Sequence, residues 1–567
     1  MSSSSSASGV LLAVGVLLAV GCRGPSVTDV SGHANAPRNS APPRNVARAD
    51  DSIERRTLAH AHFAAGVVHD LNNERDLALE EYRQAALSDP DDETLILDVT
   101  RRFLENKHPE EAVELLLPAA AKPHVSGAIL ARLGLAYSQL GQSEKAIESN
   151  RAAMKREPQI LASYQNLFLT YLQNKQADAA LKILDDAANQ AGAGADFLLG
   201  VGELYAAYAL QFPSQRESVH AKGVKVLNRV RELELASPQT RLKLADGFNL
   251  FGDTESAAKL YLTLLEQLDN LPMLRDNVRA KLADIFLRKR DRKRAAEQLE
   301  AIVKEDPTNV QAYYFLGTIA YEESRWAAAV EYWQKAILLS PDFEQAHYDL
   351  ASAQIALGKT SDALATLDQA RGRFAASFVS EYLTGVTYNR DKSYPEAIRH
   401  FAAAETIAQS RNTNQLTQGF YFQFGATCER SGDRAQAEKY FEKCLQLAPD
   451  FPEALNYLGY MWAEQGEHLE KARDMIERAL KAEPKNEAYL DSMGWVLFKL
   501  NQPKEALEFL LKAVAAAEQP DATLFDHLGD IYIALKQPDK AREAWEKSLS
   551  VEKNEQVKKK LEGAATR

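Results

Sequence analysis

Cysteine is scarce in this sequence, with 3 residues among 567. Three cysteines cannot build a disulfide framework, and the two in the body of the chain, Cys428 and Cys444, cannot complete a four-ligand zinc site. Glycine (28 residues) and proline (21 residues) also lie below their average shares. Because both residues break helices, whereas the abundant Ala, Leu, Glu and Lys favour them, the composition indicates a mainly α-helical protein.

Positive charge is in deficit as well. The chain has 67 Lys and Arg against 79 Asp and Glu, a formal net charge of −12. General binding to a phosphate backbone rests on excess Lys and Arg, so we expect no nucleic-acid partner. Hydrophobic residues make up 46% of the chain, which is enough for a folded core and excludes wholesale disorder.

The apolar run near the N-terminus is short. It extends from Val10 to Val20, 11 residues, whereas a membrane-spanning helix needs about 20. It therefore predicts a signal sequence. The adjoining residues, LAVGC up to Cys22, resemble the bacterial lipobox. That resemblance implies a lipoprotein signal peptide over 1–21 and lipidation of Cys22, and Arg23 in place of Asp implies the outer membrane. The alternative is an ordinary secretory signal in which Cys22 is incidental.

Residues 22–52 have the composition of a linker. They contain four prolines among Ser, Asn, Asp and Arg, with few apolar side chains. Such a segment cannot bury enough surface to order itself, so we predict a disordered tether. It would span roughly 30 Å as a flexible coil and roughly 90 Å in the polyproline conformation.

A pattern of small and large residues recurs along the chain with a period of about 34 residues. One copy has Gly317 in a first helix, Ala329, Trp333 and Ala336 in a second helix, and Pro341 after it. Antiparallel helices approach closely only where side chains are small, and the large residue fills the space beside the contact. Proline lacks an N–H and ends the second helix.

About 14 such units fit between residues 59 and 555. The pattern resembles the tetratricopeptide repeat. The resemblance implies an all-α fold, a right-handed superhelical solenoid of about 14 tandem helix pairs over residues 53–555. A capping helix and tail would follow at 556–567.

In this repeat family the first helix of each pair lines a concave groove, so its inward residues are candidate partner-binding positions. Aromatic side chains with polar tips suit interface anchors. The candidates are Tyr314, Tyr321, Tyr348, Tyr382, Phe422, Asn456, Tyr460, Asp491, Trp495, Phe498, Asp526 and Asp530. The alternative is that several of them pack against neighbouring helices. An acidic and aromatic groove predicts basic or apolar partner segments.

No enzyme motif is convincing. Gly358-Lys359-Thr360 lacks the first glycine of a P-loop and falls in an inter-helix turn. His62 and His69 fall at packing positions, which favours structural histidines over metal ligands. Cys428 and Cys444 occupy helix-contact positions, which favours buried thiols over a disulfide. We therefore predict no catalytic residue, cofactor or metal.

The last three units carry a more specific resemblance. The segments at 456–472, 488–500 and 525–545 are similar to a group of bacterial envelope tetratricopeptide proteins. That group includes outer-membrane lipoprotein adaptors of a carboxyl-terminal processing protease. The resemblance implies a membrane-anchored scaffold facing the periplasm, with a protease and its cell-wall hydrolase substrates as partners.

Two other functions stand beside the adaptor. One is an assembly factor for a secretion, pilus or polysaccharide-export machine. The other is a hydrolase, which would need a catalytic insert. The longest stretch that we expect to be irregular, about 206–222, is too short to hold one.

Overall fold

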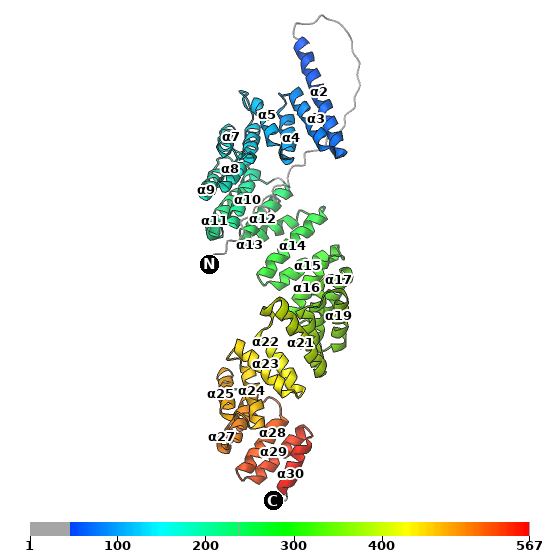
Figure 1. Ribbon diagram of the computed structural model, residues 1–567, viewed down its shortest axis with the longest axis vertical. Helices are drawn as coiled ribbons and strands as arrows, with labels where there is room; N and C mark the ends of the chain where they lie inside the picture. The colour runs from blue at the N-terminus through cyan, green and yellow to red at the C-terminus, as the bar shows by residue number, and fades with distance from the viewer. Residues whose placement is uncertain (1–45, 236, 566–567) are drawn as a thin grey trace. The chain divides into compact units, whose positions relative to one another are not determined.

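The computed structural model describes residues 46–235 and 237–565. Their regular structure consists of 29 α-helices and two short 3-10 helices, with no strand among the described residues (Figure 1). The predicted all-α fold class is confirmed. The predicted signal peptide (1–21), Cys22 and the tether as far as residue 45 lie outside the described residues and stay predictions.

The chain divides into two compact units, residues 1–298 (unit 1) and 299–567 (unit 2). The helices of unit 1, with α15 spanning the boundary, are α2 (Val46–Leu71), α3 (Arg75–Ser88), α4 (Glu93–Glu105), α5 (Pro109–Ala120), α6 (Gly127–Gln139), α7 (Ser143–Arg156), α8 (Leu161–Gln173), α9 (Ala177–Ala188), α10 (Ala195–Gln211), η1 (Pro213–Gln215), α11 (Arg216–Arg231), α12 (Pro238–Leu250), α13 (Thr254–Leu265), α14 (Pro272–Arg288) and α15 (Arg292–Glu305).

Unit 2 continues the same alternation of first and second helices. Its helices are α16 (Val310–Glu322), α17 (Trp326–Leu339), α18 (Glu344–Ala356), α19 (Thr360–Arg373), α20 (Phe378–Arg390), α21 (Tyr394–Arg411), η2 (Thr413–Gln415), α22 (Gln418–Arg430), α23 (Arg434–Leu447), α24 (Pro452–Gln465), α25 (Leu469–Ala482), α26 (Glu487–Lys499), α27 (Pro503–Ala516), α28 (Ala522–Ala534), α29 (Pro538–Val551) and α30 (Glu555–Ala565).

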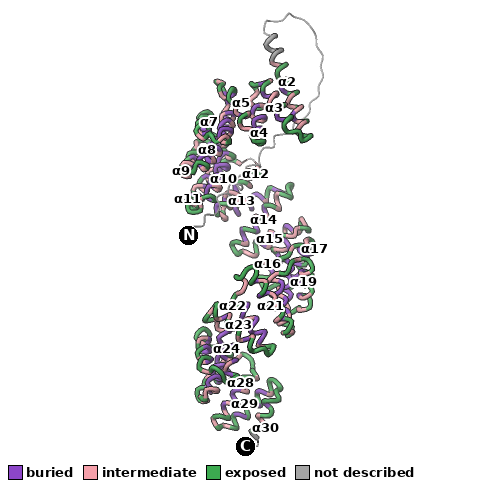
Figure 2. Tube along the Cα trace, viewed as in Figure 1, coloured by how far each residue is buried: buried purple, intermediate pink, exposed green. Residues whose placement is uncertain are grey.

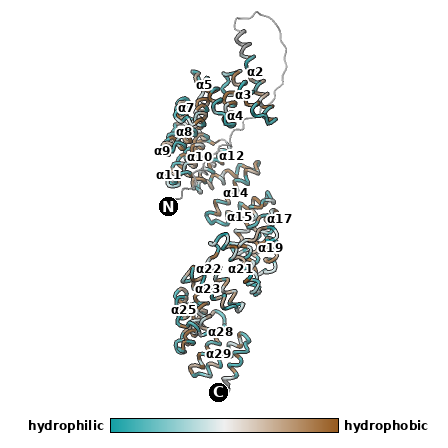
Figure 3. Tube along the Cα trace, in the orientation of Figure 1, coloured by the Kyte–Doolittle hydropathy of each residue, from teal (hydrophilic) through white to brown (hydrophobic). Residues whose placement is uncertain are grey.

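Consecutive helices form pairs, from α2 with α3 to α28 with α29. Within the described residues this makes 14 pairs and leaves α30 as a single closing helix. The predicted number of about 14 pairs is therefore confirmed. Figure 2 shows buried residues recurring along every pair, and Figure 3 shows hydrophobic and hydrophilic stretches alternating along the helices.

Glycine and an aromatic ring meet where the two helices of many pairs cross. A Cβ on Gly66 would lie 2.7 Å from the ring of Tyr82, and a Cβ on Gly317 would lie 2.5 Å from the ring of Trp333. Neither distance is compatible with a side chain unless the ring moves. Where the repeat has a glycine, the glycine thus marks the closest approach of the two helices, as the packing argument predicts.

The turn inside most pairs uses one residue with positive φ. After α4, for example, Lys107 has φ of 65°, and the His108 N–H donates to the carbonyl of Phe103 at 2.9 Å. This closure is the Schellman motif, which satisfies the last carbonyls of the first helix. Asn73, Gly141 and Lys175 have positive φ at the same point of their own repeats.

Three boundaries differ from the predictions. Helix α2 begins at Val46, so the last part of the predicted tether, residues 46–52, is helical. The stretch 206–222, expected to be irregular, is helical except around Phe212, because α10 continues to Gln211 and α11 follows η1. The closing helix starts one residue early, at Glu555, behind Asn554.

The first helices lie on the inner side of each unit. Within the described residues, the first helices of neighbouring pairs contact one another directly, as α6 does α8 and α24 does α26, more extensively than the second helices do. Closer spacing on one side curves the stack toward that side. The first helices therefore provide the inner face on which the predicted binding residues stand.

Candidate functional site

Side chains from four helices meet at the C-terminal end of unit 2. They come from the first helices α24, α26 and α28 and from the closing helix α30. We name this group the C-terminal cluster, and it consists of Tyr460, Glu464, Asp491, Trp495, Asp526, His527, Asp530 and Lys560.

The centre of the cluster is a buried ion pair between α26 and α28. His527 Nδ1 lies 2.9 Å from Asp491 Oδ1, and the two side chains are 6% and 11% exposed. The imidazole stacks on the indole of Trp495 with ring centroids 4.0 Å apart. Burial disfavours charge on the imidazole, but the charge and hydrogen bond of Asp491 outweigh it and raise the pKa of His527. An imidazole ring held by a carboxylate thus lies against an aromatic face.

A carboxylate pair on α28 holds an ammonium group. Lys560 Nζ donates to both carboxylate oxygens of Asp526, at 2.8 and 3.0 Å, and to Asp530 Oδ2 at 2.7 Å. Burial raises the pKa of Asp530, although Lys560 acts in the opposite direction. Burial also opposes charge on the lysine, but its hydrogen bonds to both carboxylates raise the pKa of Lys560. This pair of carboxylates therefore favours a bound cation.

Tyr460 connects the cluster to the preceding repeat. Its ring centroid lies 6.3 Å from that of His527, and its hydroxyl donates to Glu464 at 3.4 Å. Burial, together with the negative charges of Glu464 and Asp491, raises the pKa of Tyr460, so the phenol stays neutral. Tyr460 thus links α24 to the side chains of α26 and α28 in the cluster.

Two further side chains lie close to the indole of Trp495. The Phe498 ring lies 5.2 Å from the indole, and Lys499 Nζ lies 4.8 Å from it. An ammonium group at that distance is attracted by the negative face of an aromatic ring. Lys499 thus lies next to the C-terminal cluster, and Lys560 is the lysine within it.

Two buried polar atoms at the inner face lack a hydrogen-bond partner. They are Oδ1 of Asn456 and Nε1 of Trp495, and each residue is 7% exposed. Buried polar atoms are normally paired, so an unpaired acceptor and an unpaired donor are unusual.

The aromatic positions at the start of unit 2 are largely engaged within the fold. The hydroxyl of Tyr314 donates to Asp349 at 2.8 Å, and its ring lies 4.6 Å from that of Phe343. Tyr348 is 5% exposed, and its hydroxyl donates to Glu344 at 2.8 Å. Packing between repeats, the alternative open from the sequence, accounts for both side chains.

Tyr382 and Phe422, the next two candidate binding residues, also contact other aromatic rings of the fold. Tyr382 stacks on Phe378 with centroids 5.7 Å apart, and Phe422 lies 5.5 Å from Phe451 in the following repeat. Tyr321 differs, because it is 37% exposed. Partner binding by these residues stays a prediction, and Tyr321 has the most free surface among them.

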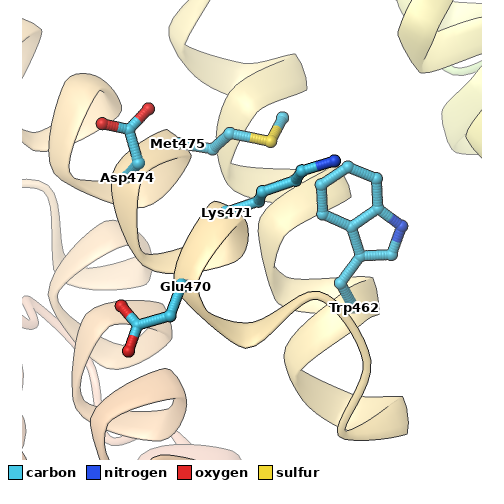
Figure 4. Close-up of a pocket in the computed structure, with 5 residues that line it drawn as sticks. All are labelled: Trp462, Glu470, Lys471, Asp474 and Met475. Carbon is cyan, nitrogen blue, oxygen red and sulfur yellow. The ribbon is translucent and has the colours of Figure 1, made fainter.

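A hollow of about 380 Å³ lies between α24 and α25. Figure 4 shows Lys471 extending toward Trp462, while the carboxylates of Glu470 and Asp474 point away from the indole. Met475 completes the lining. The hollow shares no residue with the C-terminal cluster, and its polar groups do not converge on a common point.

Three members of the cluster were missed from the sequence: Glu464, His527 and Lys560. Glu464 lies one helical turn after the predicted Tyr460, on the same side of α24. His527 directly follows a residue at an inner position and contacts the previous repeat. Lys560 lies 34 residues, one repeat length, after Asp526. Extending the repeat pattern to the closing helix would therefore have placed Lys560 at the same inner position.

The cysteines and histidines that the sequence analysis considered have partners or positions within the fold. Cys428 and Cys444 are buried free thiols, as predicted. His62 lies 2.7 Å from Glu81, and His69 lies 2.6 Å from Glu74. Over residues 46–235 and 237–565, no group of three or more His, Cys, Asp or Glu side chains is placed to hold a metal ion.

None of the described helices combines the length and apolar character that a membrane span requires.

Family models described as tetratricopeptide repeat match residues 128–160, 280–344, 320–377, 430–496 and 522–555. The chain carries tetratricopeptide repeats. The matches include the α24–α26 and α28 segments that form most of the C-terminal cluster. The tetratricopeptide repeat is generally a non-catalytic fold for protein interaction. All members of the cluster except Lys560 stand on first helices of the repeats.

Among curated proteins, 94 residues of the chain are 24% identical to Photosystem I assembly protein Ycf3 of Cyanophora paradoxa. The match covers 17% of this chain and 53% of that protein. The chain thus spans about half the length of the curated relative that it matches.

Solved structures of other tetratricopeptide repeat proteins are similar at low identity. One from Parabacteroides merdae is 15% identical, with a TM-score of 0.36, over 46% of this chain and 99% of that one. YrrB, described as a tetratricopeptide repeat protein with an unusual peptide-binding site, is 20% identical, with a TM-score of 0.30, over 36% and 97%. At these values the likeness concerns the fold alone.

Proposed function

We propose that this protein is a lipid-anchored scaffold of the bacterial cell envelope that docks partner proteins on the inner face of its repeats. The observation that supports the proposal is the C-terminal cluster, where aromatic and acidic side chains from three neighbouring first helices meet. Large aromatic side chains with polar tips anchor interfaces well. An anchor at Cys22 would add to affinity by raising the local concentration of the scaffold.

The charge of the cluster favours partners with basic or apolar segments. Glu464, Asp491, Asp526 and Asp530 contribute negative charge, and a complementary positive segment would be steered toward them. We propose a periplasmic protease and its cell-wall hydrolase substrates as partners. The similarity of residues 456–545 to envelope adaptors supports that choice.

An assembly factor for a secretion, pilus or polysaccharide-export machine is the second candidate. The name of the curated relative, an assembly protein, favours it. Both candidates use the inner face as a docking surface and need no catalysis, so the identity of the bound proteins separates them.

The membrane anchor is tested by Cys22→Ser in the producing bacterium. We expect the wild type in the outer-membrane fraction, with a lipid label on Cys22, and the variant released into the soluble periplasm. A variant that stays membrane-bound without label would show that Cys22 is not the anchor.

Partner identity is tested by capturing the full-length protein from detergent-solubilised membranes and identifying bound proteins by mass spectrometry. A Tyr460→Ala, Glu464→Gln double variant alters the half-buried Tyr460 and the exposed Glu464 and leaves the buried Trp495 in place. Glu203→Gln on α10, an exposed inner position of unit 1, is the matched control.

Loss of a protease or wall hydrolase in the double variant, but not in the control, would support the adaptor. Export or secretion components in its place would support the assembly factor. The same bound proteins in all three samples would show that the docking surface lies elsewhere.

A further inference from the structure

The C-terminal helix α30 holds a cation in an acidic site of the chain itself. We propose that Lys560 is a built-in competitor, which occupies the site where a basic side chain of a docking partner binds Asp526 and Asp530. The inference rests on the proposed scaffold function and adds to it the chemistry of the docking segment and a means of regulation.

The first argument is geometric. Asp526 and Asp530 lie one turn apart on α28, at the fifth and ninth points of the repeat, which face inward. Lys560 Nζ lies within 3.0 Å of an oxygen of each carboxylate. The two carboxylates are therefore placed to share one ammonium group, and a lysine or arginine of a partner presents the same chemistry.

The second argument comes from the unpaired atoms. Trp495 stacks on His527, the neighbour of Asp526, and its Nε1 lacks a hydrogen-bond partner. Oδ1 of Asn456, on the preceding first helix, lacks one too. Both residues are more than nine-tenths buried. A peptide carries a carbonyl and an N–H at every residue, the groups that these two atoms lack, and it reaches them once the side chains that cover them move.

The third argument concerns how α30 is held. The helix has 11 residues, a length that is marginal for an isolated helix in water. Its apolar contacts are Val557, which is 1% exposed, and Leu561, packed near Trp545 on α29. Lys558 and Lys559 are exposed. A short terminal helix with one narrow apolar stripe belongs to the least stable part of a fold and can leave without unfolding the repeats.

Competition follows from these three points. While Lys560 occupies the carboxylate pair, an incoming basic side chain must displace it, so the measured affinity is lower than that of the open site. A partner with a basic segment opens the site by displacing α30. A nucleic acid would instead meet repulsion from the carboxylates.

The test measures binding of a fluorescein-labelled synthetic peptide of five Leu-Lys repeats to the full-length protein by fluorescence anisotropy. The variants are Lys560→Ala and, as a matched loss of one positive charge on the same helix, Lys559→Ala. Lys560→Met keeps the aliphatic stem, in case truncation to Ala unfolds the end of the chain. Circular dichroism checks the fold of each variant.

We expect Lys560→Ala and Lys560→Met to bind the peptide at least about fivefold more tightly than wild type, the lower end of typical coupling between sites. Lys559→Ala should bind like wild type. Adding Asp526→Asn and Asp530→Asn to Lys560→Ala should remove the gain. In the wild type, bound peptide should also speed hydrogen exchange of the α30 amides.

Equal affinity of the Lys560 and Lys559 variants would overturn the inference. Glu464→Gln separates the two hypotheses in that case. If this variant binds the peptide more weakly than wild type does, basic segments dock at the cluster, and only the competition by Lys560 is disproved. Absence of binding to every variant would also overturn the inference, while partner capture from membranes would still decide the scaffold function.

Discussion

The two units place different side chains at the same point of the same repeat. At the fifth point of the first helix, unit 1 carries Phe63, Leu97, Ala131, Gln165, Leu199, Leu242 and Ala280. Unit 2 carries Tyr314, Tyr348, Tyr382, Phe422, Asn456, Asp491 and Asp526. The small residues at the helix contacts specify the fold in both units, so the inner points are free to vary. At this inner position, aromatic and acidic side chains are therefore concentrated in unit 2.

The units also differ in spectroscopic probes. All five tryptophans lie in unit 2, at positions 326, 333, 462, 495 and 545, together with both body cysteines. Tryptophan fluorescence therefore reports on unit 2 alone, whereas far-ultraviolet circular dichroism reports on the helices of both units.

The largest expected effect is on the core of one unit. Phe441 is fully buried against Gly425 in the α22–α23 pair. Replacement of Phe441 by Ala should lower the free energy of unfolding by about 3–5 kcal/mol, because it leaves a cavity. Tryptophan fluorescence in a denaturant series should show the loss. Hydrogen exchange of unit 1 amides should stay unchanged, because repeats couple mainly to their neighbours. If the amides of unit 1 lost as much protection from hydrogen exchange as those of unit 2, the two units would not be independent in stability.

Each unit contains a carboxylate that accepts hydrogen bonds from a tyrosine and a lysine. In unit 1, Asp185 accepts from Tyr205 at 2.7 Å and from Lys222 at 2.7 Å. In unit 2, Glu405 accepts from Tyr440 at 3.2 Å and from Lys443 at 2.5 Å. The arrangement is the same in kind, but the Asp185 side chain is 36% exposed and the Glu405 side chain 11%.

The second prediction compares these two groups by truncating the lysine. Lys443→Met leaves the buried Glu405 without its cation and should cost about 1–3 kcal/mol in free energy of unfolding. Lys222→Met affects an exposed pair and should cost less than about 1 kcal/mol. Urea unfolding followed by circular dichroism measures both. Equal losses would show that burial does not distinguish the two sites.

The third prediction concerns pH. The pKa of His527 is raised in the folded state by Asp491 despite burial, and Asp526 and Glu464 add to the shift. The stabilisation is therefore complete below the unfolded value of about 6.5 and is lost as pH rises through the folded value. The denaturant midpoint seen by tryptophan fluorescence should fall between pH 6 and pH 9. In Asp491→Asn the fall should be much smaller, and an equal fall in both proteins would exclude this pair as its cause.

The smallest expected effect is on thiol reactivity. Burial raises the pKa of Cys428 to about 12 and that of Cys444 to about 11, so neither forms thiolate near neutral pH. A disulfide reagent should label neither Cys428 nor Cys444 in the native protein. As denaturant is added, labelling should begin together with the change in tryptophan fluorescence of unit 2. Rapid labelling of the native protein would show that the α22–α23 pair opens locally.

The sequence was sufficient for the repeats because their contacts are local and periodic. Gly317 and Trp333 stand in consecutive helices and touch in the fold, and Gly66 and Tyr82 repeat both the spacing and the contact. The start of α2 was missed because Val46–Ser52 directly follows proline-rich residues and shares their polar composition.

The candidate site was less accessible to sequence reasoning. A repeat register tells which side of a helix a residue occupies but not whether a neighbour already covers it. Tyr348 and Tyr321 both stand at inner points, yet the first is buried and the second is 37% exposed. The ion pair of His527 with Asp491 joins residues 36 positions apart, and neither spacing nor composition marks such a contact.

The left-handed residue in the turn of most pairs makes the chain modular. Lys107, Gly141 and Lys175 occupy the same joint in successive repeats, with the same hydrogen bonds around each. A segment excised between two such joints contains the second helix of one pair and the first helix of the next, and the chain on either side can be rejoined in register. The length of the protein can therefore change by two helices at a time through duplication or deletion, while the turns that remain keep their geometry.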